Sequence, residues 1–167
     1  MLKNVSSVSY FRNFIFGVED SLVSTVGLLS GVAIAGVPKT TILLTGLVLI
    51  FVEAFSMAAG SFLSEYSAEG YASGSASPTT TKSNLVSGVI MFFSYLISGL
   101  VPLSSYLIWP VNTALKFSII FSVAALFILG VVGAKISKIG IIKSGLRMSV
   151  VGGTAIAVGL IAGTVLS

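Results

Sequence analysis

The sequence predicts an all-α integral membrane protein with five transmembrane helices. Of its 167 residues, 55% are hydrophobic and only 8% are charged, and the mean hydropathy is +1.09. These values lie outside the usual range of soluble domains. The apolar runs are continuous over about twenty residues, the length of a helix that spans the lipid bilayer, whereas the strands of a membrane barrel alternate in hydropathy. The chain therefore has room for five helices in one domain, and for no separate soluble domain.

The first two helices are expected at 12–36 and 40–65. Pro38 separates them, because proline cannot continue a helix. The connection at 66–83 is rich in Ser, Thr, Gly and Ala, a composition typical of a flexible loop or a frayed helix end. Pro102 falls inside a later apolar run, where neighbouring membrane helices can satisfy the carbonyl group that it frees. The remaining helices are expected at 84–107, 112–135 and 143–166.

Basic residues gather on one side of this topology. Seven of the nine Lys and Arg residues fall there, and only Lys39 and Lys116 fall on the other side. Because basic loops of membrane proteins remain in the cytoplasm, we expect a cytoplasmic N-terminus and, after five crossings, an external C-terminus. The net charge of +4 has the same explanation, so we expect no nucleic acid partner. The seven residues are Lys3, Arg12, Lys82, Lys135, Lys138, Lys143 and Arg147.

The amino-acid composition excludes several classes of enzyme. The chain contains no cysteine and no histidine, which excludes disulfides, the usual zinc sites, thiol-based or His-based catalysis, and haem ligation by these residues. Asp20 is the only aspartate, so a protease that uses paired aspartates is excluded as well. We therefore expect a protein that is not an enzyme and that holds no permanently bound cofactor.

Three of the five acidic residues, Glu19, Asp20 and Glu53, lie within the first two expected helices. Ionisable residues are costly inside a membrane, and they usually mark an ion or proton pathway. Adjacent residues point about 100° apart on a helix, so Glu19 and Asp20 cannot line the same seam. Asp20 is the better candidate, because it continues into a stripe of small residues, and Glu19 could instead reach Arg12 or the cytoplasmic interface. The stripe contains Ser24, Gly27 and Gly31.

The second expected helix carries a corresponding stripe. Its members are separated by seven, four, three and four residues, which keeps them on one face. Glu53 and Met57 are therefore one turn apart. The glycines of the two stripes predict close helix packing. The second stripe contains Gly46, Glu53, Met57, Gly60 and Ser64, and the packing glycines are Gly27, Gly31, Gly46 and Gly60.

These stripes predict a metal site within the membrane. A short connection makes the first two helices antiparallel neighbours, and Asp20 and Glu53 each lie about 12 Å from the cytoplasmic end of their helix. Carboxylate oxygen prefers hard cations and the sulfur of Met57 is softer, so the mixture favours ferrous iron or manganese. Protonation of the carboxylates would expel the metal ion, which permits exchange of metal for protons. Glu19, Ser24 and Ser56 are candidate accessory residues.

Two further acidic residues, Glu65 and Glu69, follow the second apolar run. They share one helix face if the helix continues beyond residue 65. In that case they form either a cytosolic mouth of the pathway or a pair of solvated charges at the membrane interface.

Five sequence segments occur in order along nearly the whole chain: DSLVSTVGL at 20–28, LLTGL at 43–47, FSMAAGSFLS at 55–64, SGLVPL at 98–103 and GLR at 145–147. Together they resemble the vacuolar iron transporter family, which includes the yeast calcium cross-complementer type transporters and the plant nodulin-like proteins. The chain departs from this family in two respects. Only Glu65 to Ser83 stands where plant and fungal members carry a cytosolic three-helix domain that gathers metal. Ser61 replaces a common Glu, and Glu53 stands where relatives often have a small residue.

The resemblance implies a homodimer of five-helix protomers. The pathway would lie between the first two helices of both subunits, with Asp20 and Met57 as ligands. Ferrous iron or manganese would leave the cytosol in exchange for protons, across the plasma membrane of a prokaryote or the membrane of a vacuole-like organelle in a eukaryote. Two alternatives stay open: a transporter or channel for another ion, and a structural oligomeric membrane protein without transport. The acidic residues in the apolar helices argue against the structural alternative.

Overall fold

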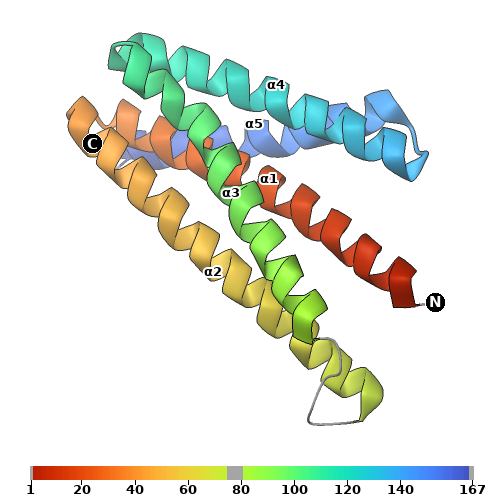
Figure 1. Cartoon of the computed structure of the whole chain (residues 1–167). Helices are drawn as coiled ribbons and strands as arrows, with labels where there is room; N and C mark the ends of the chain where they lie inside the picture. The colour runs from red at the N-terminus through yellow and green to blue at the C-terminus, as the bar shows by residue number, and fades with distance from the viewer. Residues whose placement is uncertain (1, 75–80, 166–167) are drawn as a thin grey trace.

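Five long helices make up most of residues 2–74 and 81–165, the part of the chain that the computed structural model describes (Figure 1). Each helix is long and apolar enough to cross a membrane, α1 from Ser6 onwards. The prediction of an all-helical membrane protein is therefore confirmed. Residues 75–80 of the expected loop and residue 166 lie outside the described ranges. The helices are α1 (Leu2–Ile34), α2 (Lys39–Ser73), α3 (Thr81–Ile108), α4 (Val111–Ser137) and α5 (Ile141–Val165).

The turn between α1 and α2 follows the signals in the sequence. Gly36 has a φ of 74°, a left-handed conformation that glycine adopts without strain. Pro38 stands directly before α2, and its carbonyl oxygen accepts hydrogen bonds from the amides of Thr41, at 2.9 Å, and Ile42, at 3.2 Å. The chain reverses direction here, so α1 and α2 run antiparallel (Figure 1).

Two helices are longer than expected. α1 begins at Leu2 instead of residue 12, and α2 continues beyond residue 65 to Ser73. Gly74 follows α2 with a φ of 63°, a conformation that commonly ends helices. The added turns contact α3: Ser6 of α1 lies 3.1 Å from Ser83, and Glu69 of α2 accepts a hydrogen bond of 3.1 Å from Asn84. The segment after residue 65 is therefore helical where composition alone predicts a loop or a frayed end.

The helix α3 lies between α1 and α2 (Figure 1). A Cβ atom added at Gly99 would meet Ile50 of α2 at 2.7 Å and Ser21 of α1 at 2.8 Å. A Cβ atom at Gly88 would meet the carbonyl oxygen of Ala58 of α2 at 3.0 Å. The short turn predicts that α1 and α2 are direct neighbours. In the structure, however, each of these two helices contacts α3 more extensively than it contacts the other one. The small residues of α3 permit this arrangement because they admit both neighbours.

Backbone contacts at glycines join α1 to α5. A Cβ atom added at Gly27 would meet the carbonyl oxygen of Ala155 at 3.2 Å, and one added at Gly31 would meet the carbonyl oxygen of Gly159 at 2.5 Å. Contacts advance by four residues along both helices in the same direction, so α1 and α5 run parallel. This is the relation expected of the first and fifth helices in a protein with five crossings.

The other two glycines with an expected packing role differ from each other. A Cβ atom added at Gly46 would meet Leu103 at 2.7 Å and Leu29 at 2.8 Å, so this glycine admits side chains from α3 and α1. Gly60 is exposed, and a Cβ atom there would meet nothing within 4 Å. Within the described chain Gly60 therefore makes no close helix contact, contrary to the expectation for it.

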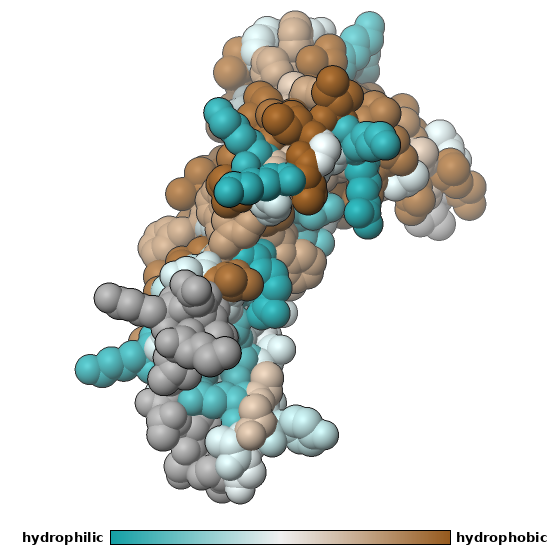
Figure 2. Space-filling view, turned by 90° about the vertical axis from the view of Figure 1, so that its right-hand side faces the viewer, coloured by the Kyte–Doolittle hydropathy of each residue, from teal (hydrophilic) through white to brown (hydrophobic). Residues whose placement is uncertain are grey.

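The buried core and the outer surface are both largely apolar. Exposed residues include Phe55 on α2, at 70%, and Ile142 on α5, at 75%, as expected of helices that face lipid. Figure 2 shows brown, apolar residues over much of the upper part of one face, with several teal, hydrophilic side chains among them, and mostly teal or pale residues over the lower part. The main core cluster contains Leu29, Ala33, Ile42, Ile50, Leu103, Tyr106 and Ala114.

Candidate functional site

Two acidic side chains from different helices lie within electrostatic range of each other. Asp20 is on α1 and Glu53 is on α2, both are partly buried, and their carboxylates repel each other. The structure thus brings together the two residues that the sequence places at one depth. A bound cation or a bound proton would relieve the repulsion, so this pair has the basic property of a cation site.

Tyr95 of α3 lies beside the acidic pair. Its side chain is fully buried, its hydroxyl group shares a hydrogen bond of 2.7 Å with Ser24 Oγ, and both Asp20 and Glu53 act on it electrostatically. Ser21 Oγ also donates a hydrogen bond of 2.6 Å to the carbonyl oxygen of Tyr95. The tyrosine is therefore held through its backbone and through its hydroxyl group at the level of the carboxylates.

Sequence reasoning missed Tyr95. The available signal was a phenol group in the middle of an apolar segment, because a buried tyrosine usually requires a hydrogen-bond partner. The sequence alone does not identify that partner, since Ser24 lies on a helix distant in the chain. Ser24, by contrast, was already a candidate accessory residue, and the structure places it at this site.

Met57 and Ser56 occupy different positions around α2. The buried face of this helix includes Ile50 and Ala54, and Met57 is partly buried, one turn beyond Glu53. Ser56 is exposed, and it points about 100° away from Met57. Glu53 and Met57 are therefore both partly buried and one turn apart on α2, whereas Ser56 lies on the exposed side of the helix.

The donor set at this site is small. Within residues 2–74 and 81–165, no group of three or more His, Cys, Asp and Glu side chains could hold a metal ion. A metal ion between Asp20 and Glu53 would need further donors from hydroxyl groups, from the sulfur of Met57, from water, or from a second copy of the chain. Such a weakly enclosed site suits an ion that must also leave.

Glu19 faces a different partner from Asp20. The basic group that acts on its carboxylate is Arg147 of α5, the helix parallel to α1. The expectation that Glu19 reaches Arg12 is not met, because Arg12 is paired with Glu65. Asp20 also acts on Glu19, but the further charged neighbour of Glu19 is Arg147 of α5, whereas that of Asp20 is Glu53 of α2.

Glu65 belongs to a polar cluster between α1 and α2. Its Oε1 atom accepts hydrogen bonds from Arg12 Nη2 at 2.9 Å, from Asn13 Nδ2 at 3.2 Å and from Ser9 Oγ. Glu69, one turn further along α2, accepts a hydrogen bond of 3.1 Å from Asn84 Nδ2 of α3. Both acidic residues of the expected mouth are therefore engaged with neighbouring helices.

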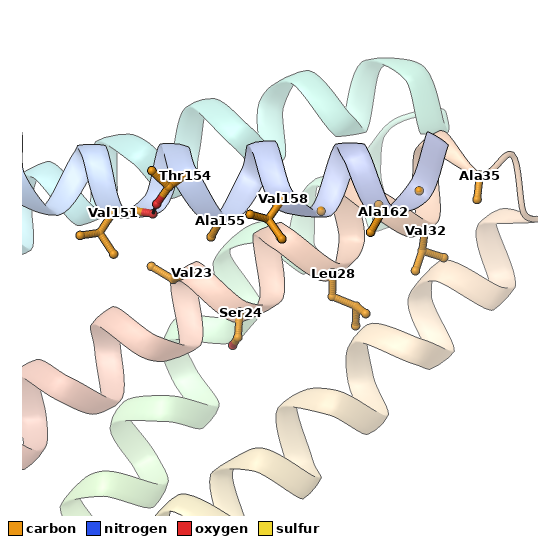
Figure 3. Close-up of a pocket in the computed structure, with 14 residues that line it drawn as sticks. Val23, Ser24, Leu28, Val32, Ala35, Val151, Thr154, Ala155, Val158 and Ala162 are labelled. Carbon is orange, nitrogen blue, oxygen red and sulfur yellow. Dashed lines mark hydrogen bonds between the residues drawn. The ribbon is translucent and has the colours of Figure 1, made fainter. Parts of the chain in front are cut away.

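An apolar groove of about 690 Å³ runs along α1 and α5 (Figure 3). Its polar side chains are Ser24 and Thr154, and the rest of its lining is aliphatic or glycine. Figure 3 shows Ser24 pointing away from α5. The groove offers no carboxylate or thioether, so it is not itself a metal site.

One comparison with known proteins identifies a family. A model of the VIT family matches residues 11–75 and 70–164. These ranges include the acidic pair, Tyr95, Met57 and the Glu65 cluster, and they cover more than half of the chain. A comparison with curated proteins gives no match.

Proposed function

The chain belongs to the VIT family, the vacuolar iron transporters, and from this membership we propose that it moves ferrous iron or manganese out of the cytosol in exchange for protons. The coarser function, transport of metal ions across a membrane, follows from the family, and the five long apolar helices make the chain an integral membrane protein. The choice of metal, the direction and the exchange for protons are the proposed part.

One observation supports the proposal: Asp20 and Glu53, on separate helices, are within electrostatic range of each other and of Tyr95, whose hydroxyl group is hydrogen-bonded to Ser24. Two carboxylates in an apolar bundle are costly unless a cation or protons neutralise them. Carboxylate and hydroxyl oxygens suit hard divalent cations, and the sulfur of Met57 shifts the preference towards ferrous iron or manganese.

The same carboxylates supply a mechanism for proton exchange. A divalent ion binds when Asp20 and Glu53 are ionised, and protons arriving from the opposite side of the membrane compete for the same oxygen atoms. Each transport cycle then alternates between a metal-bound site and a protonated site. Neither state leaves an uncompensated pair of negative charges in the membrane.

A homodimer completes the pathway in this proposal. Asp20 and Glu53 are only partly buried in a single chain, and contact between carboxylates and lipid is unfavourable. A second copy related by a twofold axis would cover both side chains and would place two acidic pairs at one interface. The interface would thus be lined by α1 and α2, with the basic side of the bundle in the cytoplasm.

The proposal is tested by metal efflux from loaded proteoliposomes. Asp20→Ala should abolish transport of Fe²⁺ and Mn²⁺, and Glu19→Gln, the matched change at the adjacent acid, should retain it. Competition with Co²⁺, Zn²⁺, Ca²⁺ and Mg²⁺ tests the choice of metal. Transport by Asp20→Ala at the wild-type rate would reject the site, and a clear preference for Ca²⁺ or Mg²⁺ would reject the proposed substrates.

A further inference from the structure

Two separate connections join α1 to α2. At one end is the covalent turn at Gly36 and Pro38, and at the other is the cluster of Arg12 and Glu65. The two helices contact each other less than either contacts α3, and Asp20 and Glu53 lie along them between these two connections, within electrostatic range of each other. The Glu65 cluster therefore joins α1 to α2 on the side of the acidic pair that is opposite the covalent turn.

A single carboxylate oxygen forms the centre of the Glu65 cluster. Glu65 Oε1 accepts the hydrogen bonds of Arg12, Asn13 and Ser9 at the same time. A metal ion that binds Glu65 through this oxygen must therefore displace the guanidinium group of Arg12. The Arg12 side chain is 68% exposed, whereas the Glu65 side chain is 16% exposed. The arginine can therefore move into water while the glutamate stays between α1 and α2.

We propose that Arg12 is a gating residue that occupies Glu65 in the absence of metal and yields it to an arriving divalent cation. Displacement replaces one positive charge by two at the same carboxylate, and it releases the N-terminal part of α1 from α2. Asp20 lies about two turns beyond Arg12 on α1, and Glu53 lies about three turns before Glu65 on α2. This inference rests on the proposed transport of metal ions, and it adds to that function the residue that controls access.

The contacts around the cluster indicate which element moves. The N-terminal part of α1 is held to α3 by hydroxyl contacts, at 3.1 Å between Ser6 and Ser83 and at 3.3 Å between Ser9 and Ser87. Water can replace such hydrogen bonds at little cost. Close backbone approaches join α3 to α2 at Gly88 and to α1 at Gly17. We therefore assign the movement to the part of α1 before Gly17, with the rest of α1, α2 and α3 remaining together.

The first test measures transport kinetics for Mn²⁺ in Arg12→Gln and Arg12→Lys. Loss of the competing guanidinium group in Arg12→Gln should lower KM about fivefold, the factor expected for one exposed ion pair, and Arg12→Lys should stay near the wild-type value. An unchanged or raised KM in Arg12→Gln would overturn the inference, because an arginine with only a structural role does not compete with metal.

The second test does not alter Arg12 or Glu65. The chain has no cysteine, so Ser6→Cys combined with Ser83→Cys creates one defined disulfide between α1 and α3. Oxidation should stop Mn²⁺ transport and reduction should restore it, whereas each single cysteine variant should transport under both conditions. Full transport by the crosslinked protein would overturn the proposal that α1 moves away to admit the metal ion. Asp20→Ala, assayed in parallel, reports on the transport site separately, so failure of the gate and failure of the proposed function are distinguishable.

Discussion

The hydroxyl group of Tyr95 lies 2.7 Å from Ser24 Oγ, and this hydrogen bond joins α3 to α1 beside Asp20 and Glu53. The bond holds two hydroxyl oxygens together on a tyrosine that is within electrostatic range of both carboxylates. It therefore links the packing of the bundle to the proposed transport site.

Removal of this hydroxyl group should affect both stability and transport. Tyr95→Phe leaves the Ser24 hydroxyl without this partner, so we expect a loss of about 1 kcal/mol in the free energy of unfolding and a KM for Mn²⁺ raised severalfold. Tyr106→Phe is the matched control, because the buried Tyr106 hydroxyl donates to the Leu29 carbonyl oxygen at 3.4 Å, away from the acids. An equal change in KM for both variants would contradict a specific role for Tyr95.

Neutralisation of Glu53 should make the free energy of unfolding independent of Mn²⁺. Glu53→Gln removes the repulsion with Asp20, so the metal-free protein should gain up to about 1 kcal/mol in the free energy of unfolding. Thermal unfolding in detergent should show that Mn²⁺ stabilises the wild type, because a ligand stabilises the state that binds it, but no longer stabilises Glu53→Gln. Glu19→Gln should keep the stabilisation by Mn²⁺. If Glu53→Gln kept it too, Glu53 would not be a ligand.

The contact between α1 and α5 should be sensitive to a single methyl group. In Gly159→Ala the new Cβ atom would clash with the carbonyl group of Gly27, so we expect a loss of about 1 to 3 kcal/mol in the free energy of unfolding. Gly153→Ala on the same helix meets nothing within 4 Å and should be neutral or slightly stabilising. Denaturant titration of both variants compares these outcomes directly, and similar stabilities would argue against the close approach of the two helices.

The proposed dimer can be tested at Gly60. This residue is exposed, with no atom near an added Cβ within the described chain, and it lies on a helix of the proposed interface. Gly60→Leu should weaken the dimer, measured by light scattering in detergent, while leaving the helical circular dichroism unchanged. Gly153→Leu, at an equally open position on α5, should leave the dimer intact. A dimer undisturbed by Gly60→Leu would place the interface elsewhere.

The sequence by itself determined the class of fold, the number of helices and the positions of the acids. Continuous apolar runs specify membrane helices because the bilayer leaves no other way to satisfy the backbone. Helical spacing also separated Asp20 from Glu19 and joined Glu53 to Met57, because a helix repeats every 3.6 residues. These properties are local, so they could be predicted without knowledge of the packing.

Only the tertiary structure decided what lies between the first two helices and where they end. The small residues of α3 allow it to approach both α1 and α2, which brings Tyr95 to the acidic pair. The added turns of α1 and α2 make hydrogen-bond contacts with α3, at Ser6 and Ser83 and at Glu69 and Asn84. Composition favours a loop after residue 65, but contacts with a neighbouring helix outweigh a weak local preference. Contacts between residues far apart in the chain therefore decide where α1 begins and where α2 ends.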